Sequence, residues 1–275
     1  MELARTTCVR TLLFLILLLA AFASWGFAQA APPPPQTEES PSPTPRGVEE
    51  EDPTKPVAFS IRDEYRNSKN GAWSNTAIFR IDRLVLKNFG IKGGGKGLIL
   101  RFDAPFNSVH RGATTKNGLG DLYFQGLYIP RVGLKRLVAV GTGIVFPTAT
   151  SDILGRGKMI LAPTIIPIWY FHRRERLFLV RAQNYVSVAG KDRRPNVNYL
   201  LVAPTLIHKV SRRWWLAEDT EFKYDWHNKL ASAITGLQIG RMIKKGFGFW
   251  VKPEVGWGPG RQSDFNLKFT AFRIR

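Results

Sequence analysis

The chain has 275 residues, of which 44% are hydrophobic and 12% aromatic, and it carries a formal net charge of +19. This apolar and aromatic content excludes a chain that is disordered overall. The single cysteine, Cys8, lies in the first residues and excludes a disulfide framework or a cysteine-ligated metal site in the rest of the chain. The basic charge indicates anionic surroundings, such as lipid headgroups, nucleic acid or an acidic solute.

The first 54 residues divide into two segments that we expect to lie outside the folded domain. Residues 1–30 have the form of a secretory signal peptide, because Arg5 and Arg10 precede an apolar run that ends in small residues suited to cleavage. An uncleaved membrane anchor is the alternative. Residues 31–54 are rich in Pro, Ser, Thr and Glu, a composition that favours a disordered linker, with a Pro-rich binding segment as the alternative. Residues 55–275 form the predicted folded domain.

Apolar and polar residues alternate through the folded domain with the two-residue period of β-strands. In 97–106, for example, Arg101 and Asp103 fall between apolar residues, and Lys252 and Glu254 do so in 247–257. The predicted strands lie near 57–66, 76–86, 97–106, 120–130, 136–147, 159–171, 176–188, 196–208, 213–226, 229–241, 247–257 and 264–275. Most have about ten residues, the length of a tilted transmembrane strand.

The pattern therefore predicts an all-β protein, an antiparallel transmembrane β-barrel of about 12 strands. A soluble secreted β-sandwich is the alternative, because alternation does not say whether the apolar face meets lipid or a second sheet. Aromatic residues near strand ends suit the two interfacial girdles of a barrel. These are Tyr128, Trp169, Tyr170, Phe171, Trp214, Trp215, Trp226 and Trp257.

The connections between the predicted strands differ on the two sides of the barrel. With residue 55 in the periplasm, the inner turns are strongly basic, and they are 87–96, 130–136, 172–176, 209–213 and 241–245. The outer loops are polar and include 67–75, 107–118, 148–158 and 190–196. Prolines inside the predicted strands remove ladder donors, so we expect bulges or shifted strand boundaries there. They are Pro163, Pro167, Pro204 and Pro253.

Charged and amide side chains on the polar faces are the candidate lining of the barrel interior. In a narrow barrel they must pair across strands or face water. The predicted lining residues are Arg101, Asp103, Asp121, Gln125, Arg181, Gln183, Asp219, Glu221, Lys223, Lys252 and Glu254. Two interpretations follow: a mixed-charge channel or binding site for a small solute, and a packed, salt-bridged interior with no conduit.

Catalytic and metal-binding patterns are weak. The histidines, at 110, 172, 208 and 227, are dispersed and show neither a Ser–His pattern nor metal-ligand spacing. The glycine run 93–95 lacks the strand–loop–helix context of a phosphate loop. We therefore expect no enzymatic activity, no metal and no cofactor. Anionic headgroups explain the basic turns more simply than nucleic acid does, because an exported protein rarely meets nucleic acid.

A set of glycine, proline and acidic positions in the central third resembles a known family. GLGD at 118–121, GTG followed by PT within 141–148, and GRG at 155–157 resemble the outer-membrane transporter family of the MetA pathway of phenol degradation. The pattern departs at Ala149, where that family usually has Gly. The motif residues are Gly118, Gly120, Asp121, Gly141, Gly143, Pro147, Thr148, Gly155, Gly157 and Pro163.

The resemblance implies a signal peptide, a β-barrel of this size and residence in the outer membrane of a Gram-negative-type bacterium, with the linker in the periplasm. Together with the polar inward faces it predicts a channel or transporter for small solutes, with aromatic or hydrophobic molecules as one candidate class. Outer-membrane lipids and the barrel assembly machinery are the other expected partners. The alternatives are a non-transporting structural or adhesive barrel and a lipid-modifying barrel enzyme. The oligomeric state stays open.

Overall fold

A computed structural model describes residues 57–68, 72–86, 97–111, 113–130, 136–171 and 175–274. The predicted signal peptide, the linker and the basic turn at 87–96 lie outside the described residues. The strands are β1 (Val57–Ser68), β2 (Trp73–Leu86), β3 (Gly97–Arg111), β4 (Thr114–Leu119), β5 (Leu122–Ile129), β6 (Arg136–Phe146), β7 (Lys158–Phe171), β8 (Arg176–Gly190), β9 (Asn198–Lys209), β10 (Trp214–Asp225), β11 (Leu230–Lys244), β12 (Phe247–Trp257) and β13 (Ser263–Ile274).

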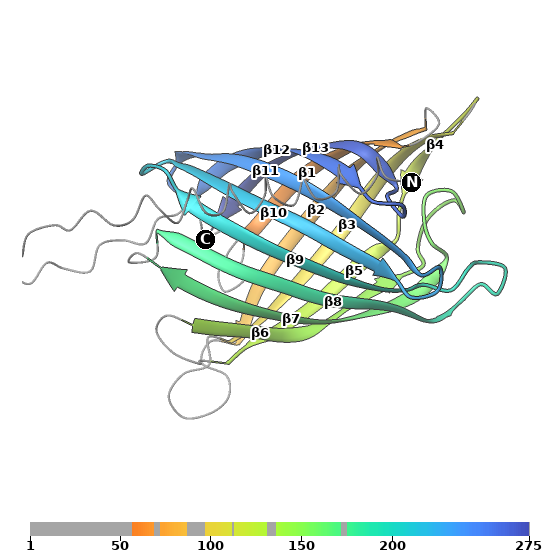
Figure 1. Cartoon of the computed structure of the whole chain (residues 1–275), viewed down its shortest axis with the longest axis horizontal. Helices are drawn as coiled ribbons and strands as arrows, with labels where there is room; N and C mark the ends of the chain where they lie inside the picture. Colours follow the sequence, from red (N-terminus) through yellow and green to blue (C-terminus); the bar gives the residue numbers. More distant parts are fainter. Residues whose placement is uncertain are drawn as a thin grey trace, which may run out of the picture. The chain divides into compact units, whose positions relative to one another are not determined.

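These strands form one antiparallel sheet that closes on itself (Figure 1). Consecutive strands pair with each other except β4 and β5, and β1 also pairs with β13. The short strands β4 and β5 both pair with β3, one after the other along its length, and act as a single wall strand interrupted at Gly120 and Asp121. The barrel therefore has 12 wall strands, as the sequence predicts. No helix among the described residues is long and apolar enough to span a membrane.

Alternating side chains face opposite sides of this wall. In β7, buried residues alternate with more exposed ones along the strand. Large apolar side chains project outward, including Ile81 and Val255, which are 53% and 58% exposed. A β-sandwich would cover such residues with a second sheet, whereas every described strand belongs to the one closed sheet. The alternative of a β-sandwich is wrong.

The prolines do not produce the expected bulges or shifted boundaries. Pro163 pairs with Thr142 of β6, while the pairing of β7 with β8 has a gap at Pro163. Pro167, Pro204 and Pro253 show the same arrangement, with pairing kept on one side and a gap on the other. A missing N–H removes the ladder bond on one side of the residue only, so the strand continues through it.

The predicted outer loop 107–118 is mostly regular structure. The strands β3 and β4 continue past the rim as a hairpin, in which the His110 ring and the Thr115 hydroxyl are hydrogen-bonded at 2.9 Å. The His110 ring also stacks on Trp73 of β2 at 5.5 Å. These cross-strand contacts stabilise the hairpin, which the polar sequence alone does not indicate.

One end of the barrel interior is filled by apolar side chains. We call it the closed end; there β1 begins and β13 ends. Trp215, Trp250 and Phe272 are at most 2% exposed, and the Trp215 and Phe272 rings meet edge to face at 6.0 Å. The cluster comprises Ile99, Leu127, Ile129, Leu137, Ala139, Ile166, Ile168, Tyr170, Leu177, Leu179, Ile207, Trp215, Ala217, Met242, Trp250, Phe272 and Ile274.

Two of the aromatic residues predicted for the interfacial girdles belong to this cluster instead. Trp215 and Tyr170 point into the barrel and are buried, whereas Trp214, Trp226 and Trp257 are exposed on the outside. Trp214 and Trp215 are adjacent, so the pleat must send them to opposite faces of the wall. Proximity to a strand end therefore does not decide which face an aromatic residue occupies.

Candidate functional site: the barrel interior and its mouth

Beyond the closed end, the interior is lined by paired charges. Arg80 of β2 lies directly opposite Asp103 of β3, and Asp82 lies opposite Arg101. Each arginine binds its partner with two hydrogen bonds, at 2.7 and 2.7 Å for Arg80–Asp103 and at 2.9 and 2.9 Å for Arg101–Asp82. Bidentate charge-assisted pairs of this kind are strong and geometrically specific. They join β2 to β3 and neutralise both buried carboxylates.

A second group of charges lies on β10, β12 and β13. The Lys252 ammonium is 2.8 Å from Asp219 and 3.1 Å from Glu254, and the Lys268 ammonium is 2.8 Å from Glu254. Asn266 donates a further hydrogen bond to Glu254 at 3.1 Å. Glu254 is almost fully buried, and these donors satisfy its charge.

Two more ion pairs complete what we call the ion-pair belt. Arg181 contacts Glu221 at 2.6 Å, and Arg66 contacts Glu64 at 2.8 Å. The belt surrounds an interior cavity of about 470 Å³. Of the predicted lining residues, this cavity is lined by Arg101, Asp103, Asp121, Gln125, Arg181, Gln183, Asp219, Glu221 and Lys252. Glu254 is buried beside Lys252, and Lys223 lines a separate pocket at the mouth.

Several belt residues were not predicted from the sequence. Arg62, Glu64 and Arg66 alternate with outward residues in β1 and line the same cavity. Arg80 and Asp82 do the same in β2. The alternation of polar and apolar residues in β1 and β2 was sufficient to place these side chains on the inward face. Lys268 of β13 was also missed as a lining residue.

A ladder of polar side chains runs along the wall between the belt and the mouth. The Tyr185 hydroxyl donates to the Gln183 side-chain oxygen at 2.9 Å, and the Gln183 amide donates to the Tyr123 hydroxyl at 3.1 Å. Tyr199 stacks on Tyr185 with ring centroids 4.6 Å apart. The ladder offers hydroxyl and amide groups to whatever occupies the interior.

At the opposite end from the closed end, the mouth, residues 147–157 form a long connection that we call the mouth loop. Its main anchor is Asp121, which sits in the break between β4 and β5. One oxygen of Asp121 accepts the Ala149 N–H at 3.1 Å, and the other accepts the Arg156 N–H at 2.6 Å. The Thr148 hydroxyl accepts the Leu122 N–H at 3.0 Å. Both ends of the loop are therefore bound to the start of β5.

Side chains from outside the motif hold the rest of the mouth loop. Asn107 donates to the Leu154 carbonyl at 2.7 Å, and Leu154 is buried. Arg194, in the loop after β8, donates to the carbonyls of Asp152, Gly155 and Arg156. Neither anchor was predicted, because no local pattern marks a side chain that binds carbonyls about 40 residues away.

Close approach explains two of the motif glycines. A Cβ at Gly143 would lie 2.3 Å from the Tyr123 hydroxyl, and one at Gly155 would lie 2.3 Å from the Ala149 Cβ and 2.5 Å from Asp121. The remaining motif residues lie at the β4–β5 break, in the mouth loop and in the strands on either side of that loop. Gly118 lies near the end of β4 and Gly120 in the break, Gly141 lies in β6, Pro147 and Thr148 begin the mouth loop, Gly157 ends it, and Pro163 lies in β7.

An exposed ion-pair cluster ties the mouth loop to the loop after β8. Asp152 contacts Lys191 at 2.7 Å and Arg193 at 2.6 Å. The hydrogen bond from Lys191, together with the positive charges of Arg193 and Arg194, holds the pKa of the Asp152 carboxyl below its usual value.

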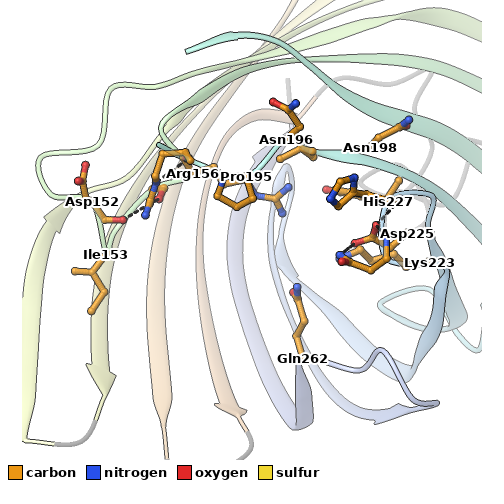
Figure 2. Close-up of a pocket in the computed structure, with 15 residues that line it drawn as sticks. Asp152, Ile153, Arg156, Pro195, Asn196, Asn198, Lys223, Asp225, His227 and Gln262 are labelled. Carbon is orange, nitrogen blue, oxygen red and sulfur yellow. Dashed lines mark hydrogen bonds between the residues drawn. The ribbon is translucent and has the colours of Figure 1, made fainter. Parts of the chain in front are cut away.

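The mouth loop forms one side of a pocket of about 800 Å³, shown in Figure 2. Two basic side chains, Arg156 and Lys223, lie over the Tyr199 ring. The Lys223 nitrogen is 4.5 Å from the ring centroid, and the Arg156 guanidinium carbon is 5.3 Å from it. Arg156 and Tyr199 also line the interior cavity. The pocket and the cavity therefore meet at these two residues.

The histidines are not brought together. His110 lies at the tip of β3, His208 lies near the closed end of β9, and His227 lies in the turn after β10. His172 lies outside the described residues. The described part of the chain contains no group of three side chains that could ligate a metal.

Comparisons with known proteins give relatives by structure only. No protein-family model matches the sequence, and no curated protein matches it. The crystal structure of the COG4313 outer membrane channel from Pseudomonas putida F1 is similar with a TM-score of 0.69 at 10% identity, over 81% of this chain and 96% of that one. The NanC porin is similar with a TM-score of 0.55 at 11% identity, over 79% of this chain and 100% of that one. The KdgM porin, in complex with disordered oligogalacturonate, is similar with a TM-score of 0.56 at 8% identity, over 79% of this chain and 98% of that one.

These similarities show the fold, a closed β-barrel of the kind found in outer-membrane channels of known structure. At such low identity they do not carry a substrate, and the resemblance to the MetA-pathway family stays a prediction.

Proposed function

We propose that this protein is an outer-membrane channel for small solutes. The observation that carries the proposal is the cavity of about 470 Å³ inside the closed barrel, which is lined by charged and polar side chains. Buried polar groups are costly unless they are hydrogen-bonded or hydrated, so a cavity with this lining favours water and polar solutes. The solved barrels of the same fold that are porins or channels support the same role.

The outward face of the barrel supports its location in a membrane. Phe79, Ile81 and Phe269 are 45%, 53% and 47% exposed, and they belong to a wall that carries many more large apolar side chains. A soluble protein rarely exposes so continuous an apolar surface, whereas a membrane barrel requires one. We propose the outer membrane, with the closed end and the linker on the periplasmic side and with lipids and the barrel assembly machinery as partners.

The closed end favours a second candidate function, a barrel that does not transport. Trp215, Trp250 and Phe272 fill the interior there, and no water-sized path through such a dry layer is expected. For the channel proposal, this layer is a gate that is shut in the conformation described. For the structural alternative, it is permanent.

Aromatic or hydrophobic solutes remain the class that the family resemblance favours. The belt and the Tyr–Gln ladder favour solutes that also carry polar groups, because an apolar solute could not replace the hydrogen bonds of hydration water there. We further propose that the protein is not an enzyme. Turnover of phospholipid or lipopolysaccharide that is lost on substitution of one histidine would contradict this.

The test is reconstitution of the purified full-length chain into liposomes and planar bilayers, after a boiled-versus-unboiled gel shift has shown that the barrel is closed. The channel proposal expects swelling in at least one small solute and discrete conductance steps. Trp250→Ala should raise the swelling rate if the apolar layer is the gate, whereas Phe269→Ala on the outer face should not. A heat-shifting wild-type barrel that passes no solute and no current would instead establish the structural alternative.

A further inference from the structure

We propose that Arg156 and Lys223 form a binding site for a small organic carboxylate in the mouth pocket, an inference that deepens the proposed channel function by naming a solute class. The first observation is how their ion pairing differs from that of the belt cations. Among the residues that the structure describes, the belt cations each contact a carboxylate. Neither Arg156 nor Lys223 forms an ion pair with a described carboxylate.

Both cations are positioned by rigid surroundings. The Arg156 N–H is donated to Asp121 at 2.6 Å, and its carbonyl accepts from Arg194 at 3.2 Å, so its backbone is fixed on both sides. Lys223 lies in β10, within the barrel wall. Both side chains contact the ring of Tyr199, which is itself buried. The site is therefore already formed before any ligand binds, and preorganisation lowers the cost of binding.

The two acidic residues that line the pocket, Asp152 and Asp225, direct their hydrogen bonds to other groups, while the charge of Asp225 still attracts Lys223. One oxygen of Asp225 accepts the backbone N–H groups of His227 and Asn228, and the other accepts the Asn228 side-chain amide, each at 3.0 Å. Asp152 is paired with basic residues of the loop after β8. Two cations held over one aromatic ring repel each other, and a carboxylate that contacts both would remove that repulsion.

The rest of the pocket indicates an organic ligand instead of a simple inorganic anion. Ile153, Pro195 and Val197 contribute apolar surface to the lining. A volume of about 800 Å³ is far larger than a lone inorganic anion needs. Pockets that combine apolar walls with a few polar groups typically bind small organic molecules. We therefore expect a carboxylate with a small apolar body, for which benzoate is a suitable probe.

Binding is best measured on the full-length chain in detergent by calorimetry, so that the result does not depend on transport. Benzoate should bind, whereas benzyl alcohol and benzylammonium should bind at least tenfold more weakly, because they lack the charge that both cations attract. Arg156→Gln and Lys223→Gln should each weaken benzoate binding about tenfold, and Arg156→Lys should keep part of it. Arg261→Gln removes the same charge from the mouth but outside the pocket, and it should leave binding unchanged.

The outcomes separate this inference from the channel proposal. Benzoate binding that Arg156→Gln weakens in a barrel without solute flux would support the site and contradict the channel. Flux without benzoate binding would contradict the site alone. Inorganic phosphate binding as tightly as benzoate would overturn the organic carboxylate as the ligand. Each variant must first show the wild-type gel shift, and if Arg156→Gln fails this, Lys223→Gln decides the matter.

Discussion

Replacing Asp121 by Ala should release the mouth loop while leaving the barrel closed. The carboxylate accepts two backbone N–H groups, from Ala149 at 3.1 Å and from Arg156 at 2.6 Å. Hydrogen bonds to a charged group contribute roughly 1.5–3 kcal/mol each when buried. Water can reach the released amides at the mouth, so we take about 2 kcal/mol for the pair, which corresponds to roughly a 30-fold larger population of open loop.

Hydrogen exchange of the Ala149 and Arg156 amides measures this population directly. Both amides should exchange roughly 30-fold faster in Asp121→Ala, while the heat shift of the barrel stays as in the wild type. Asp264→Ala is the matched control, because its carboxylate also lies at the mouth but pairs with Arg261 at 2.6 Å. Wild-type exchange rates in Asp121→Ala, or equal acceleration in the control, would refute the anchoring role.

Three further predictions follow from packing and charge. Gly143→Ala places a Cβ 2.3 Å from the Tyr123 hydroxyl and should destabilise the barrel by about 1–3 kcal/mol. The temperature at which the unheated gel band converts to the heated one should fall. Gly126→Ala, whose nearest contact is 3.7 Å, should change this temperature little. Because the pKa of the Asp152 carboxyl is lowered in the folded protein, its ion pairs are complete at neutral pH and are lost only when the pH falls through that lowered pKa, below the ordinary range of an aspartate. The mobility of a spin label in the mouth loop should rise as the pH falls through this range, and Asp152→Asn should abolish the pH dependence. Arg80→Ala leaves the buried Asp103 carboxylate without its ion-pair partner, so the free energy of unfolding in urea should fall by about 3–5 kcal/mol. Replacing both residues by apolar ones should restore most of this loss.

The barrel fold was predictable because a membrane strand meets different surroundings on its two faces. The segment 247–257 coincides with β12, and the inward charges of 97–106 point where the alternation placed them. The segment 107–118 was predicted as a loop because its residues are polar, yet beyond the rim both faces of a strand meet water and polarity no longer distinguishes strand from loop. The hairpin there is defined by the antiparallel pairing of β3 with β4, and not by composition.

The candidate site was predictable only where one strand carries the signal. The motif residues are scattered over the central third of the sequence, and the role of those at the mouth loop depends on contacts such as Asp121 to Arg156, which span 35 residues. Arg194 and Asn107 have no local pattern at all. The apolar closed end was missed for another reason: Trp215 and Trp250 have apolar neighbours on both faces, so alternation does not distinguish inside from outside.

For the proposed channel, the order of layers along the barrel determines where passage would be controlled. Within the described part of the chain, Arg156 and Lys223 of the mouth pocket form no ion pair, whereas the belt has paired charges. At the closed end, Trp215, Trp250 and Phe272 are packed with no described polar partner for either indole N–H. Moving an isolated carboxylate into such a dry layer costs far more than the charges of the mouth could recover, on the order of tens of kcal/mol without hydration. A solute bound at Arg156 could therefore leave toward the closed end only after these side chains move and water enters. The unpaired indole groups are the ones that entering water would satisfy, which makes the closed end, and not the mouth loop, the place to look for the gate.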